Sequence, residues 1–91
     1  MTLQEIKTKI QKEHIAPAGA IDLLDPYIAA NPRDDEALTL RGIKHWSCGH
    51  RAEAINDYLA AIKINPESKA VEAMKATYDI LDYYNKDLYN P

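Results

Sequence analysis

Apolar and small residues recur with helical spacing along the chain. Between residues 35 and 68, two sets of three positions have the spacing i, i+4, i+7. The first set is Leu38, Gly42 and His45, the second is Ala54, Tyr58 and Ala61, and Gly49 separates them. Residues at this spacing share one face of a helix. The pattern predicts two helices that face each other. Gly42 and Ala54 stand where the two backbones approach closely, and Pro66 closes the second helix.

The N-terminal third is also predicted to be helical. Leu3, Ile6 and Ile10 form an apolar stripe, and Thr2 followed by Glu5 is the pattern of a capping box that starts a helix. Pro26 interrupts the next helical segment, residues 17–30. This segment is either one kinked helix or two pieces, the second starting at Pro26, because proline removes a backbone donor inside a helix.

A repeat of 34 residues relates the two halves of this pattern. Residues 20–32 and 54–66 are identical at five of thirteen positions at that constant offset: Ala20/Ala54, Ile21/Ile55, Ile28/Ile62, Asn31/Asn65 and Pro32/Pro66. An internal period of this length is typical of stacked helical repeats.

Residues 35–68 resemble a tetratricopeptide repeat. The positions that carry the resemblance are Leu38, Gly42, Gly49, Ala54, Tyr58, Ala61 and Pro66, whereas Arg41 and His45 replace the usual leucine and tyrosine. The resemblance implies an all-α fold, a right-handed stack of antiparallel helix pairs in an α-solenoid of about five helices. The chain is then one domain, with a degenerate repeat at 1–34, the well-matched repeat at 35–68, a capping helix at 68–85 and a tail at 86–91. Val71 and Met74 are expected on the apolar face of the cap, and Glu72 and Lys75 on its polar face.

Composition narrows the possible functions. The net charge is −3 and the basic residues are scattered, which argues against a nucleic-acid surface. No apolar run approaches the roughly 18 residues that a membrane span requires, and no apolar signal core follows Met1, so we expect no membrane partner and a cytoplasmic protein. The single cysteine, Cys48, cannot form an internal disulfide, which is consistent with that compartment.

The stretch HWSCGH, residues 45–50, gathers the only tryptophan, the only cysteine and two histidines. Structural zinc needs four ligands, usually from two segments, and a nucleophilic cysteine needs a base in a pocket. A short turn offers neither. We therefore interpret the stretch as a turn at Gly49 and expect no metal, no cofactor and no catalytic residue.

The resemblance also implies where a partner binds. In tetratricopeptide proteins the first helices of the repeats line a concave groove for extended or helical peptides. By that resemblance the central contact residues are Thr39, Ile43 and Trp46, about 100° around the helix from Leu38. The remaining candidates are Lys9 and Lys12, together with three residues of the capping helix: Thr77, Ile80 and Tyr84. The alternative for Trp46 is burial by neighbouring helices.

These observations predict a non-catalytic module that binds a peptide or a helix of a partner protein in a groove. The alternative is a structural unit whose exposed apolar stripes pair with a second copy, as a homodimer. Some tetratricopeptide domains bind a chaperone's C-terminal carboxylate through basic and amide side chains in the groove. The matching positions of this chain hold Glu5, Lys9, Leu40 and Met74, and only Lys9 is basic. We therefore expect apolar or mixed-charge ligands.

Overall fold

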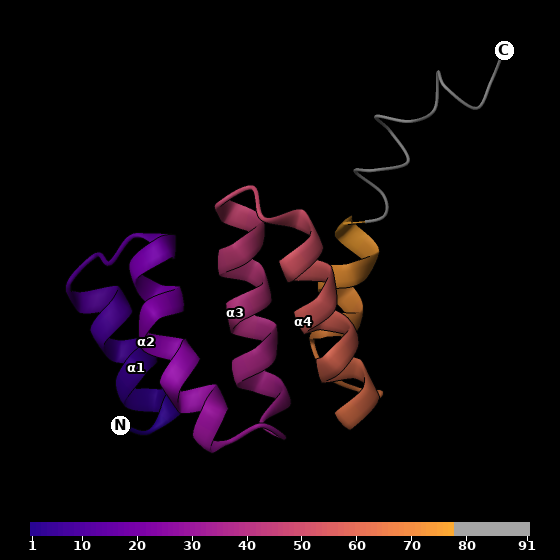
Figure 1. Cartoon of the computed structure of the whole chain (residues 1–91), viewed down its shortest axis with the longest axis horizontal. Coiled ribbons are helices and arrows are strands. Elements are labelled where there is room, and N and C mark those ends of the chain that lie inside the picture. Colours follow the sequence, from indigo (N-terminus) through magenta and orange to yellow (C-terminus); the bar gives the residue numbers. More distant parts are fainter. Residues whose placement is uncertain (78–91) are drawn as a thin grey trace, which may run out of the picture.

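The computed structural model describes residues 1–77, which contain five helices and no strand (Figure 1). Four helices are α1 (Leu3–Lys12), α2 (Pro17–Ala30), α3 (Asp35–Ser47) and α4 (Arg51–Ile64), and residues 70–77 form a further helical segment. Consecutive helices run in opposite directions, and α3 packs most extensively against α4 and next against α2 (Figure 1). The predicted all-α class is confirmed.

Local sequence explains where the helices begin. The capping box at α1 is present, since the Glu5 amide donates to Thr2 Oγ1 at 3.1 Å and the Thr2 amide donates to Glu5 Oε1 at 3.4 Å. Asp34 caps α3 by accepting from the Ala37 amide at 3.1 Å. Helix α2 has no side-chain cap but starts with Pro17, whose missing amide hydrogen needs no partner there.

Helix α2 continues through Pro26. Of the two alternatives for residues 17–30, the single helix is therefore the observed one. The Pro26 side chain lies on the solvent side, while Leu24 and Ile28 are buried, so packing on both sides of the proline holds the helix together.

The turn between α3 and α4 depends on glycine. Gly49 has a φ of 79°, in the left-handed region where a side chain is disfavoured, and its amide donates to the Trp46 carbonyl at 3.0 Å. The predicted turn at HWSCGH is confirmed.

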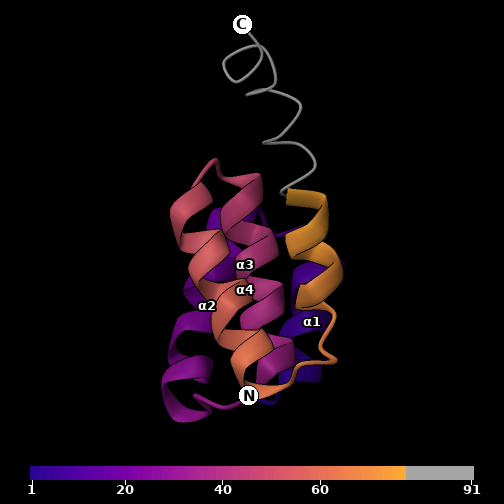
Figure 2. The same cartoon turned by 90° about the vertical axis from the view of Figure 1, so that its right-hand side faces the viewer.

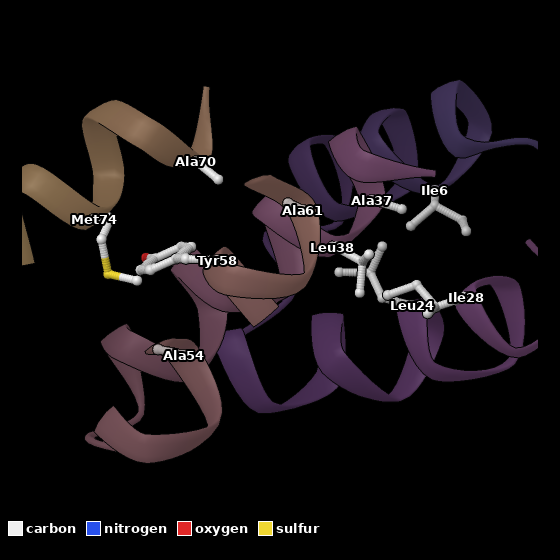
Figure 3. Packing of buried hydrophobic residues seen from close by; sticks show 10 residues of the cluster. All are labelled: Ile6, Leu24, Ile28, Ala37, Leu38, Ala54, Tyr58, Ala61, Ala70 and Met74. Carbon is white, nitrogen blue, oxygen red and sulfur yellow. The ribbon is translucent and has the colours of Figure 1, made fainter. Parts of the chain in front are cut away.

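One apolar core joins all five helices (Figure 3). Its buried members are Ile6, Leu24, Ile28, Ala37, Leu38, Ala54, Tyr58, Ala61, Ala70 and Met74. Gly42 is required for this packing, because a Cβ atom there would lie 2.6 Å from Tyr58 Cε1. Met74 is 6% exposed as expected, but Val71 is 42% exposed. The assignment of Val71 to the apolar face was wrong, because the core lies on the side of Ala70 and Met74.

Arg41, which stands where an apolar residue was expected, binds two carboxylates. Its Nε and Nη2 donate to the two oxygens of Asp57 on α4, both at 2.8 Å, and its Nη1 donates to Asp25 on α2 at 3.0 Å. The Asp57 side chain is only 9% exposed. A single guanidinium therefore connects three helices with the bidentate geometry that arginine favours.

Candidate functional site

A pocket of about 370 Å³ opens beside α3. Its lining comes from three separate parts of the chain: Lys7 of α1, then Asp35, Glu36, Thr39, Leu40 and Ile43 of α3, and Asn65, Glu67, Ser68 and Lys69 of the segment after α4. Figure 2 shows α1 and the segment 70–77 on one side of the molecule and α2 on the other. The pocket therefore lies on the side formed by the first helix of each pair.

The apolar part of the pocket comes from α3. Ile43 is 42% exposed and Leu40 is half-buried, one turn apart in sequence. Thr39 is nearly buried, and its hydroxyl donates to the Asp35 carbonyl at 2.8 Å, which satisfies its polar atom inside the helix. Leu40 and Ile43 thus form an apolar strip in the pocket, and the neighbouring Thr39 hydroxyl already has a hydrogen-bond partner.

Charged and amide groups surround this strip. Lys7 forms an ion pair with Glu36, which connects α1 to α3. Asn65 donates from its side-chain nitrogen to Asp35 at 3.3 Å and accepts from the Glu67 amide at 3.0 Å. The start of α3 and the turn after α4 are thereby held together, and the rim carries both signs of charge.

Two of the three residues predicted as central contacts lie in this pocket, namely Thr39 and Ile43. Trp46 does not line it. The indole is half-buried, packs against the core and lies under the guanidinium of Arg51, 5.4 Å from its ring centroid. On this face of α3, Ile43 is therefore exposed to solvent, whereas Trp46 is partly covered by Arg51.

Of the remaining candidates, the three that the structure describes do not line the pocket. Lys9 forms an ion pair with Glu13 at 3.0 Å, and Lys12 is exposed near the end of α1; neither lines the pocket. Thr77 is 3% exposed and donates its hydroxyl to the Ala73 carbonyl at 3.0 Å. Ile80 and Tyr84 fall outside the described residues.

Sequence reasoning missed several pocket residues, above all Lys7, Asn65 and Ser68. Lys7 belongs to the degenerate first repeat, where it stands at a consensus core position, and Asn65 and Ser68 belong to the link after α4. Leu40 is apolar at a position where carboxylate-binding tetratricopeptide domains carry a polar or basic residue, and this gives no sign that it lines a pocket. The one signal available was Asn65–Pro66, which repeats Asn31–Pro32 and marks a fixed turn at this place.

A second pocket, of about 290 Å³, lies between α1 and α2 at the N-terminal end. Tyr27 on its wall donates its hydroxyl to Asp34 at 2.6 Å. This hydrogen bond is the main cause that raises the pKa of Tyr27 above its ordinary value. This pocket lacks the charged rim of the pocket beside α3. Its ionisable lining groups are Asp22, Tyr27 and the amino group of Met1.

The stretch HWSCGH forms the last turn of α3, residues 45–47, and the tight turn into α4, residues 48–50. His45 Nδ1 and His50 Nδ1 are 3.2 Å apart, and Cys48 between them is half-buried and free. Across residues 1–77, no three His, Cys, Asp or Glu side chains are grouped so that they could hold a metal ion. In the same range, no helix is both long and apolar enough to cross a membrane.

Comparison of the chain with known protein families, with curated proteins and with solved structures found no match. The interpretation of the pocket therefore depends on its own geometry and on the internal repeat.

Proposed function

We propose that this chain is a non-catalytic, tetratricopeptide-like interaction module that binds a peptide or a helix of a partner protein in the pocket beside α3. The observation that carries the proposal is the pocket itself, with Ile43 exposed at its apolar part. The 34-residue repeat, the helix order and the close approach at Gly42 support a right-handed stack of helix pairs. In such a stack the pocket corresponds to the concave side.

The lining favours a mixed-charge ligand with one apolar anchor. An apolar side chain of the ligand fits against Ile43 and Leu40, because burying their exposed surface provides the main driving force. Lys69 and Glu67 on the rim offer opposite charges to flanking residues of the ligand. Rim charges contribute more to specificity and association rate than to affinity.

The proposal is tested by selecting binding peptides from a random library and measuring their affinities for two variants. Ile43→Glu places a charge in the pocket and should weaken binding at least tenfold. Leu59→Glu is the matched control, because Leu59 is 52% exposed on α4 and does not line the pocket. Failure to select any peptide, or equal losses in both variants, would contradict the proposal.

The alternative, a self-associating unit, has one observation in its favour. Leu59 is exposed on α4 at the position where the first repeat has Asp25, and half-buried Ile55 and Ile62 flank it. In the first repeat, Ile21 and Ile28, which correspond to Ile55 and Ile62, are buried at 8% and 7% exposure. The face of α4 is therefore more open than the matching face of α2.

Sedimentation equilibrium over a range of concentrations separates the two functions. Association that weakens in Leu59→Glu and not in Ile43→Glu would support the self-associating unit. A constant monomer mass at all concentrations would exclude it and leave the pocket as the binding surface.

A further inference from the structure

The two histidines that flank Gly49 form a pair that no function above uses. His45 lies in the last turn of α3, and His50 is the residue before the first turn of α4. Their rings are tilted by 48°, with the two Nδ1 atoms 3.2 Å apart. His50 is exposed and His45 is half-buried, so solvent reaches the pair.

The spacing of the two nitrogen atoms suits a shared metal ion. Imidazole nitrogen binds Zn²⁺ at about 2.0–2.1 Å, so two ligands at a tetrahedral angle lie about 3.3 Å apart. At a right angle, as in octahedral or square-planar geometry, they lie about 2.9 Å apart. The observed 3.2 Å is between these values. Without an ion, the same distance accommodates one hydrogen bond, with one Nδ1 protonated and the other accepting.

We propose that His45 and His50 chelate one divalent transition-metal ion, of the class Zn²⁺, Ni²⁺ or Cu²⁺ that prefers imidazole. Both rings then carry their proton on Nε2, and water completes the coordination. No third side chain of residues 1–77 joins the pair, so the site is weak and exchangeable and differs from a structural zinc site with four ligands. The bound ion connects the end of α3 to the start of α4 across the Gly49 turn.

The test is calorimetric titration of the untagged chain with Ni²⁺, carried out in a Cys48→Ser background so that the thiol cannot contribute. One Ni²⁺ per chain should bind, and His50→Gln and His45→Gln should each weaken binding at least tenfold. His14→Gln is the matched control, because His14 is the only other histidine and lies in the turn between α1 and α2. It should leave binding unchanged, and Mg²⁺, which prefers oxygen ligands, should give no binding.

A second measurement does not depend on the binding heat. Ni²⁺ should raise the thermal midpoint of the chain, because the ion binds the folded turn, and this rise should disappear in His50→Gln. The proposal is overturned if Ni²⁺ does not bind, if His50→Gln binds as the parent does, or if His14→Gln loses binding to the same extent.

Discussion

Arg41 shows how one residue can replace an apolar contact with a polar connection. In place of the leucine expected from the repeat, it satisfies both oxygens of the nearly buried Asp57 and also reaches Asp25. The hydrogen bond to Asp57 is the main cause that raises the pKa of Arg41, so the guanidinium stays charged at any pH the fold survives.

Removing this arginine should be costly. Arg41→Leu leaves the carboxylate of Asp57 buried without its partner, and we expect a loss of about 2–3 kcal/mol in the free energy of unfolding, measured with urea. The double variant Arg41→Leu, Asp57→Leu should recover part of the loss. Lys7→Leu, which breaks the exposed ion pair with Glu36, should cost less than about 1 kcal/mol. Equal losses for Lys7 and Arg41 would contradict this account.

Tyr58 should make the fold sensitive to alkali. Burial is the main cause that raises its pKa above the ordinary 10.0, with a smaller contribution from Asp57. The folded chain therefore keeps the phenol proton at a pH where the unfolded chain has lost it. The stability due to this group is complete below about pH 10 and is lost as the pH rises further.

Tyr58→Phe removes this titration, because phenylalanine keeps the buried ring and lacks the ionisable hydroxyl. Its urea midpoint at neutral pH should remain close to that of the parent. Above about pH 10 it should fall less steeply. Identical pH profiles of the two proteins would show that burial of Tyr58 does not control the alkaline limit.

At the scale of elements, the helix boundaries were largely predictable. Thr2 and Glu5, Pro17, Gly49 and Pro66 each mark a helix end through a local backbone requirement, and local requirements can be read from sequence. Whether Pro26 divides α2 could not be predicted, because the outcome depends on the packing of Leu24 and Ile28 against other helices.

Helix α2 should therefore be stabilised by replacing its internal proline. Pro26→Ala restores a backbone hydrogen bond, and we expect a gain of about 2 kcal/mol after allowing for the greater freedom of the unfolded chain. Ala29→Ser, at an exposed position of the same helix, is a control that should change stability by less than about 0.5 kcal/mol. Thermal unfolding followed by circular dichroism measures both, and a destabilised Pro26→Ala would mean that the proline improves local packing.

At the scale of the whole molecule, the pocket shows the limit of prediction from sequence. Helical spacing places Thr39 and Ile43 on a second stripe of α3, and the resemblance to a tetratricopeptide repeat assigns that stripe to the groove. Lys7 and Ser68 could not be placed beside them, because this requires the packing of α1 and of the turn after α4 against α3. Trp46 shares the face of Ile43, but Arg51 from the next helix covers its ring.

The most direct test of the account is to map the binding surface by NMR. The backbone amide resonances of the labelled chain would be followed during titration with the tightest peptide from the library selection. We predict the largest shifts at Leu40, Ile43 and Ser68, with little change at Leu59 on α4. Shifts centred on Leu59, or on Tyr27 in the pocket between α1 and α2, would contradict the proposal that the pocket beside α3 binds peptides.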